Sequence, residues 1–117
     1  MNAFKQLRDG YIISHVNHIK FPIVTSSNII RKKVTFSGRV QMVGFRFEIY
    51  CIAERMKLTG WVKNLEDGSV ETELQGEESQ IYFLVNNMKS LKRAYVKNMT
   101  MRDVPISAGE KNFTILR

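Results

Sequence analysis

The chain contains little cysteine, little proline and no long apolar run. Cys51 is the one cysteine among 117 residues, so no intramolecular disulfide can form and a reducing compartment is expected. The apolar stretch at 11–19 is interrupted by histidine and asparagine, and falls far short of the ~20 apolar residues that a membrane-spanning helix needs. No charged segment followed by an apolar one opens the chain, which argues against a secretory signal. We therefore expect a cytoplasmic protein that does not bind membranes.

Acidic residues are also in the minority. The chain has 11 Asp and Glu against 18 Lys and Arg, which gives a formal net charge of +7 at pH 7. With 44% hydrophobic and 25% charged residues, the composition is that of one soluble domain with its own core. The positive charge favours an anionic partner, but leaves open phosphate esters, nucleic acid and acidic surfaces.

From residue 31 onwards the hydrophobic pattern alternates between strand and helix periods. It predicts helices around the apolar stripes at 45–56 and 81–91, and strands at 33–38, 59–65, 69–75, 95–102 and 112–116. Asp67-Gly68 is a strong hairpin signal between the second and third strands. This order predicts an α+β fold, a ferredoxin-like βαββαβ sandwich with two helices packed on one face of a four- to five-stranded, mainly antiparallel sheet. The fold alone does not predict a function.

Residues 1–30 differ from the rest of the chain. They show no sustained period, and Pro22 and the Ser26-Ser27-Asn28 cluster favour a loop. The segment Phe21-Pro22-Ile23-Val24-Thr25 fits a short edge strand, where proline is tolerated. We predict an N-terminal extension of unknown role at 1–30, dispensable for chemistry, followed by one functional domain at 31–117.

The loop between the first strand and the first helix carries the strongest chemical signal. Its sequence is Gly38-Arg39-Val40-Gln41-Met42-Val43-Gly44-Phe45-Arg46. The first N–H groups of a helix lack intrahelical partners and lie at the positive end of its dipole, so a glycine-containing loop there can bind an anion. Arg46, in the first helical turn, can hold two phosphate oxygens with its planar guanidinium. From spacing alone, turn glycines and a solvated arginine are an equally good interpretation.

A second stretch, Gly60-Trp61-Val62-Lys63-Asn64-Leu65, ends the strand before the hairpin. The Asn64 amide both donates and accepts hydrogen bonds, so it can hold a water molecule in one orientation. Without further context, an ordinary turn role is the favoured interpretation of this asparagine. Trp61 is expected to pack in the core or on a sheet face.

The chain resembles the acylphosphatase family over roughly residues 31–117, in the stretches Gly38-Arg39-Val40-Gln41, Phe45-Arg46, Gly60-Trp61-Val62-Lys63-Asn64 and Asp67-Gly68-Ser69-Val70. The resemblance implies hydrolysis of acyl phosphates to a carboxylate and inorganic phosphate. It places the family's phosphate-binding arginine at Arg46 and its water-positioning asparagine at Asn64. It assigns the phosphate-binding loop to Gln41, Met42, Val43, Gly44 and Phe45. It implies a small-molecule substrate with no metal and no cofactor, and we expect a monomer.

Met42 departs from the family pattern, which has glycine at this position. A positive φ would strain a methionine, and a crowded loop would force its side chain outward or over the phosphate entrance. The alternative is therefore a degenerate, non-catalytic acylphosphatase-like module that binds anions or acts as an interaction domain.

Two other functions are disfavoured by the residues. RNA-recognition domains share the element order, but their third strand presents aromatic residues, whereas 69–74 contains Glu71 and Glu73 and no aromatic residue. His15 and His18 have no third ligand nearby to complete a zinc set. Cys51 is expected to be buried and inert. We therefore expect no nucleic-acid partner and no metal site.

Overall fold

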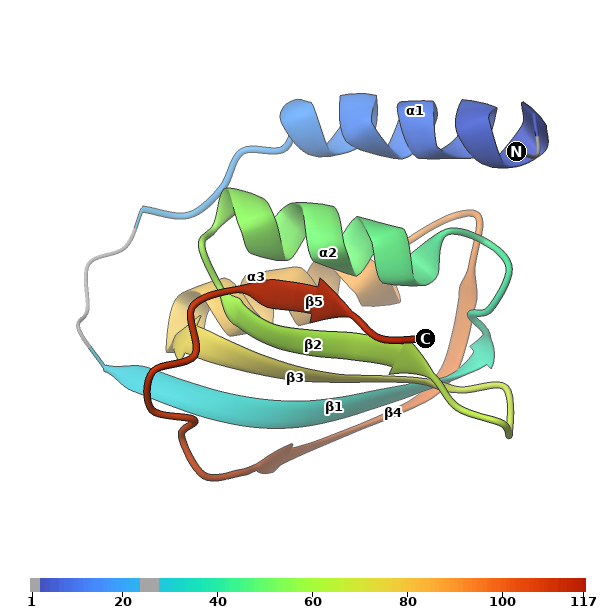
Figure 1. Ribbon diagram of the computed structural model, residues 1–117. Helices are drawn as coiled ribbons and strands as arrows, with labels where there is room; N and C mark the ends of the chain where they lie inside the picture. Colours follow the sequence, from blue (N-terminus) through green and yellow to red (C-terminus); the bar gives the residue numbers. More distant parts are fainter. Residues whose placement is uncertain (1–2, 24–27) are drawn as a thin grey trace.

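The computed structural model of the chain describes residues 3–23 and 28–117. Along the chain these residues form α1 (Ala3–Asn17), β1 (Ile29–Arg39), α2 (Phe45–Arg55), β2 (Thr59–Asn64), β3 (Val70–Glu77), α3 (Glu78–Lys89), β4 (Tyr95–Asp103) and β5 (Phe113–Ile115). Figure 1 shows three layers: the sheet, then α2 and α3 on one of its faces, then α1 lying across α2.

The strands of the described residues form one sheet in the order β4-β1-β3-β2-β5. β1 pairs antiparallel with β3 and β4, and β2 pairs antiparallel with β3, whereas the short β5 is parallel to β2. The residues that alternate toward the helices are fully buried, which matches the period-2 pattern of half-buried strands. They include Val34, Phe36, Val62, Val70 and Leu74.

The helices α2 and α3 cover this apolar face because each carries a stripe of buried residues. Ile49 and Ile52 of α2, and Ile81 and Leu84 of α3, are completely buried. At the start of α2, the Phe45 ring meets the Phe36 ring edge-on, with centroids 5.1 Å apart. The predicted ferredoxin-like arrangement of two helices on one face of a mainly antiparallel sheet is confirmed.

The other face of the sheet carries polar and charged side chains. Trp61 lies there, with the ammonium groups of Lys63 and Lys33 at 5.1 and 6.0 Å from its ring. The expected sheet-face packing of Trp61 is therefore confirmed. Arg31, only 5% exposed, donates hydrogen bonds to Glu73 and Glu110, and so fastens the connection between β4 and β5 onto this face.

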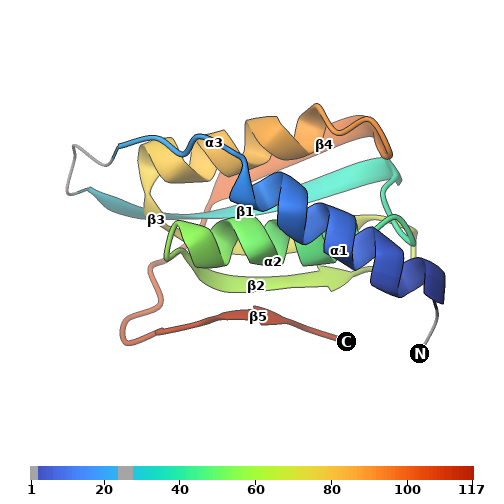
Figure 2. The ribbon, with the colours of Figure 1, turned by 90° about the horizontal axis from the view of Figure 1, so that it is seen from above.

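The helix α1 was not predicted from the sequence. Its buried face toward the domain consists of Ile12 and Val16, while Phe4, Leu7 and Tyr11 stay exposed, so its apolar residues form no single stripe. Figures 1 and 2 show α1 resting on α2, on the side away from the sheet, with its N-terminal end near the C-terminus of the chain. Ile12 and Val16 belong to the same hydrophobic core as the sheet and the other helices.

The sequence predicts an edge strand at 21–25, and the structure shows no strand in the part of this segment that it describes. Residues 21–23 are not in a strand, and 24 and 25 lie outside the described residues. The Phe21 ring instead packs against Phe83 of α3, with centroids 5.7 Å apart, and under the Arg55 guanidinium of α2. Side-chain packing on the two helices, rather than backbone pairing, holds this segment. Within the described residues, no helix is long and apolar enough to cross a membrane.

Substitutions at two neighbouring isoleucines test how much α1 contributes to the stability of the domain. Ile12 is fully buried, whereas Ile13 is 46% exposed. We expect Ile12→Ala to lower the free energy of unfolding by about 3 kcal/mol, because it leaves a cavity in the core. Ile13→Ala should change it by less than about 0.5 kcal/mol. Urea denaturation measures both, and equal effects would show that α1 does not fold as part of the core.

Candidate active site

A cavity of about 300 Å³ opens at the end of the sheet where β2 stops and α2 begins. Figure 1 shows the arrowhead of β2, the start of α2 and the C-terminus at this same end of the molecule. Four parts of the chain supply its walls: α1, the β1–α2 loop with the first turn of α2, the end of β2, and the C-terminal residues. The lining residues are Lys5, Arg8, Asp9, Val40, Met42, Gly44, Phe45, Arg46, Phe47, Asn64, Ile115 and Arg117.

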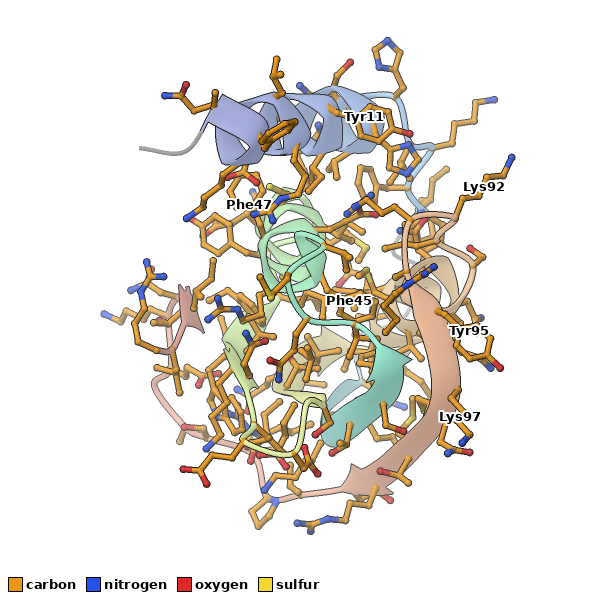
Figure 3. The ribbon with its side chains drawn as sticks, turned by 90° about the vertical axis from the view of Figure 1, so that its right-hand side faces the viewer. Tyr11, Phe45, Phe47, Lys92, Tyr95 and Lys97 are labelled. Carbon is orange, nitrogen blue, oxygen red and sulfur yellow. The ribbon has the colours of Figure 1, made fainter. Side chains whose placement is uncertain are left out.

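The first turn of α2 presents its positive end to this cavity. Gly44 precedes the helix with φ 76° and ψ 18°, a left-handed conformation that glycine adopts without strain. No side chain caps the helix there, so the first-turn N–H groups remain available to an anion. Figure 3 faces this end of the molecule and shows Phe45 between α2 and the sheet, with Phe47 on the other side of the helix.

Gln41 fastens the loop to the β2–β3 hairpin. Its side-chain Nε2 donates to the carbonyl oxygens of Leu65, at 2.8 Å, and Ser69, at 2.9 Å. The hairpin is itself a closed turn, in which Ser69 N–H donates to the Asp67 carboxylate. The side chain of Gln41 thus points to the hairpin and does not line the cavity, and its role is to keep the loop in register with the end of β2 that carries Asn64.

Val43 does not line the cavity either, but its carbonyl fixes the loop. Arg93, in the connection between α3 and β4, donates from Nε to Val43 O at 2.7 Å. Across a trans peptide the N–H points opposite to the C=O, so this bond directs the Gly44 N–H away from Arg93, and Gly44 itself lines the cavity. Arg93 was not singled out from the sequence, because a lone arginine carries no spacing signal.

The same arginine is paired with a buried carboxylate. Glu48 of α2 is completely buried and accepts hydrogen bonds from Arg93 Nη2 and Asn87 Nδ2. His15 of α1 places its Nε2 at 3.9 Å from Glu48 Oε2, the oxygen that accepts from Asn87. Because a buried charge needs such partners, Glu48 in turn fixes Arg93 and so the peptide that follows Val43.

Arg46 stands in a strongly cationic environment. Its Nη1 donates to the Leu116 carbonyl at 3.3 Å, which holds the side chain beside the C-terminal residues. Burial, together with repulsion from the positive charges of Arg117 and Arg8, lowers the pKa of Arg46 below its ordinary value. An anion bound beside these groups would relieve that repulsion, so the cavity is suited to a phosphate-sized dianion.

Asn64, at the end of β2, lines the same cavity and carries a buried acceptor atom. Among the described residues, its Oδ1 is the one buried side-chain nitrogen or oxygen without a hydrogen-bond partner. A buried polar atom without a partner costs about 1–3 kcal/mol, so such an atom often marks a functional position. The structure therefore brings together Arg46, Asn64, Met42, Gly44 and Phe45 of the residues predicted from sequence.

Met42 has the positive φ that the sequence analysis considered, at 64°. Its side chain is 93% exposed and stands at the rim of the cavity. The first of the two expected effects, backbone strain, therefore applies, and the side chain points outward rather than into the phosphate-binding loop. A left-handed conformation costs a non-glycine residue about 1–2 kcal/mol.

Two other groups singled out from the sequence, Cys51 and His15, do not line this cavity. Burial raises the pKa of the Cys51 thiol to about 11, so it is protonated near neutral pH, although the residue is half-buried rather than buried as expected. His15 stacks on Tyr11, with ring centroids 6.2 Å apart. Within 3–23 and 28–117, no group of three His, Cys, Asp or Glu side chains is placed to hold a metal ion.

A ferredoxin-like sheet with a cationic cavity at a strand-to-helix loop defines an α+β protein with a site suited to an anionic ligand. The acylphosphatase profile matches residues 32–115 of the chain. The chain belongs to the acylphosphatase family.

Individual proteins agree with this assignment. The chain is 41% identical to an acylphosphatase of Clostridium beijerinckii over 88 residues, which are 74% of this chain and 98% of that protein. It is 39% identical to an acylphosphatase of Geobacillus kaustophilus over 87 residues, covering 74% of this chain and 93% of that one. The solved structure of an acylphosphatase from Coxiella burnetii matches with a TM-score of 0.71 at 33% identity, over 80% of this chain and 100% of that chain.

Two variants separate the roles of the hydrogen bonds that Arg93 donates to Val43 and to Glu48. Arg93→Ala should lower the free energy of unfolding by about 3 kcal/mol, because Glu48 loses its charged partner. It should also weaken binding of inorganic phosphate, because the Val43 carbonyl loses its donor. Adding Glu48→Gln should restore part of the stability but not the phosphate affinity.

Urea denaturation and calorimetric titration with phosphate measure these two effects. Lys92→Ala, at the exposed neighbouring position, is the matched control and should change neither quantity. Unchanged phosphate affinity in folded Arg93→Ala would show that the loop keeps its shape without this bond.

Proposed function

We propose that the protein hydrolyses acyl phosphates to a carboxylate and inorganic phosphate, with Arg46 and Asn64 as the catalytic residues. Membership of the acylphosphatase family supports the reaction. The phosphoryl group would bind the first-turn N–H groups of α2 and the Arg46 guanidinium, which are preorganised around negative charge. The observation that carries the assignment of residues is that Asn64, whose buried Oδ1 is unpaired, lines the same cavity as Arg46.

The chemistry fits the groups that the cavity offers. A carboxylate leaves without being protonated, so the reaction requires no dedicated general acid. In the transition state negative charge spreads over the phosphoryl oxygens, where an arginine and backbone N–H groups stabilise it. Asn64 Oδ1 would accept a hydrogen bond from the attacking water and so orient its lone pair toward phosphorus. A neutral amide is too weak a base to deprotonate the water, and the substrate's own phosphate would take that proton.

Two alanine variants separate binding from chemistry. Arg46→Ala should lose both phosphate affinity and rate, with kcat/KM falling on the order of 10³-fold. Asn64→Ala should lose about 10²-fold in kcat while it still binds inorganic phosphate, because it acts on the water. The assay is phosphate release from benzoyl phosphate with excess chelator, combined with calorimetric titration.

The controls for these variants are Arg102→Ala and Asn86→Ala, both exposed and outside the cavity lining. Both should retain the parent activity. Full turnover in Asn64→Ala would remove asparagine from the water site, and loss of the parent activity on adding chelator would show a metal requirement.

Met42 distinguishes a working enzyme from the alternative, a non-catalytic anion-binding module. Strain of about 1–2 kcal/mol is small beside electrostatic stabilisation of the transition state, so we propose a slower enzyme rather than an inactive one. Met42→Gly should raise kcat/KM or tighten phosphate binding, because glycine accepts the positive φ and clears the rim of the cavity.

The matched control is Lys57→Gly. Lys57 has a similar φ of 58°, at the far end of α2, and is exposed. Both variants should gain stability, measured by urea denaturation, but only Met42→Gly should change phosphate affinity. A folded parent without activity that stays inactive as Met42→Gly would favour the non-catalytic module.

We further propose that the protein acts as a cytoplasmic monomer without a nucleic-acid partner. Its single cysteine supports a reducing compartment, and one chain by itself supplies both proposed catalytic residues to the cavity. The N-terminal segment 1–30 and the catalytic domain 31–117 remain the proposed division of the chain, although the core and the cavity wall both include residues of α1.

A further inference from the structure

The helix α1 lies outside the residues that match the acylphosphatase profile, yet it forms part of the cavity wall. The profile covers 32–115, whereas Lys5, Arg8 and Asp9 line the same cavity as Arg46 and Asn64. In the sequence these residues carry no motif, and no period marks the helix that presents them. The cavity of this chain therefore has a wall that the profile residues alone do not supply.

The contact between α1 and the phosphate-binding loop is close. A Cβ atom placed on Gly44 would lie 2.6 Å from Ile12 Cδ1 and 2.8 Å from Arg8 Nε. Any side chain at position 44 would therefore force the Ile12 and Arg8 side chains of α1 to shift. Ile12 is fully buried and anchors the helix there, so the Arg8 guanidinium is held directly beside the loop glycine.

The charge in the cavity exceeds what one phosphoryl group needs. The lining residues in the described chain carry four cationic side chains and one carboxylate: Lys5, Arg8, Arg46 and Arg117, with Asp9. Arg8 Nε is bonded to Asp9 at 3.2 Å, while the two Nη groups of its guanidinium extend the donor set beyond the loop. With Arg46 and the first-turn N–H groups assigned to the phosphoryl group, Arg8 is left to a second part of the ligand.

We infer that Arg8 is a specificity-determining residue that binds a second negative charge, carried by the acyl part of the substrate. This inference rests on the proposed function, since it assumes that the phosphoryl group occupies the loop beside Arg46. The substrates it favours are acyl phosphates whose carbon skeleton bears a carboxylate or a further phosphate. A neutral acyl group would offer Arg8 no anionic group beyond the Asp9 carboxylate that it already holds.

The test uses two rigid substrates of the same shape. 4-Carboxybenzoyl phosphate places a carboxylate opposite the acyl phosphate, and 4-methylbenzoyl phosphate places a methyl group at the same point. The parent protein should prefer the first by about tenfold in kcat/KM, the size of one charge-assisted hydrogen bond. In Arg8→Gln the preference should fall to about twofold or less, and Arg8→Lys should retain part of it.

Arg102→Gln is the matched control, since it removes the same charge from the exposed edge strand β4 and should keep the parent's preference. Raising the ionic strength should reduce the preference of the parent but not that of Arg8→Gln. Thermal unfolding followed by circular dichroism confirms that the variants fold. Equal kcat/KM for both substrates in the parent, or an equal loss on both substrates in Arg8→Gln, would overturn the inference.

A binding measurement distinguishes failure of this inference from failure of the proposed function. The two corresponding β-ketophosphonates, in which a methylene group replaces the bridging oxygen, are not hydrolysed and are titrated by calorimetry. If the parent hydrolyses neither acyl phosphate, the proposed function fails. An Arg8-dependent preference for the carboxylated ketophosphonate would still support the second anion site, and binding without that preference would overturn it.

Discussion

The hydrogen bond from Arg93 to the Val43 carbonyl fixes the peptide plane between Val43 and Gly44, in the loop that leads into α2. Arg93 holds the carbonyl of this peptide from one side, so the N–H points to the other side, and Gly44 lines the cavity. Glu48 fixes Arg93 through a fully buried carboxylate. Anion binding by backbone N–H groups requires this kind of fixed geometry, because a loop that had to reorganise around each ligand would lose affinity to the ordering cost.

Most of the fold could be predicted because its signals are local and repeated. Alternation in the strands and apolar stripes in α2 and α3 arise from burial on one face, which the sequence records directly. The hairpin at Asp67-Gly68 is also a local property, whereas the positive φ at Met42 was one of two possibilities raised by the family resemblance. The two proposed catalytic residues were found because they belong to two separate motifs that the family resemblance joined.

What sequence reasoning missed depends on contacts between distant residues. The hydrogen bond from Arg93 to Val43 spans 50 positions, and no local sequence pattern near either residue predicts it. α1 was missed because its buried side chains are few, and exposed Phe4, Leu7 and Tyr11 blur its period. Its place beside Gly44 follows from the docking of Ile12, so the contribution of Arg8 to the cavity was not visible before the helix had a position.

The sheet ends at β4, whose outer backbone groups have no neighbouring strand in the described chain. Such an edge can template the growth of a sheet from one molecule to the next. Here Lys97 and Arg102 are exposed along it, and the pairing of β4 with β1 is interrupted by a bulge at Ser37 and Gly38. Figure 3 shows Tyr95 and Lys97 projecting outward from this strand. Two such edges would bring like charges together on a locally bent ladder, so the same excess of positive charge that suits an anionic ligand also opposes fibrillar association.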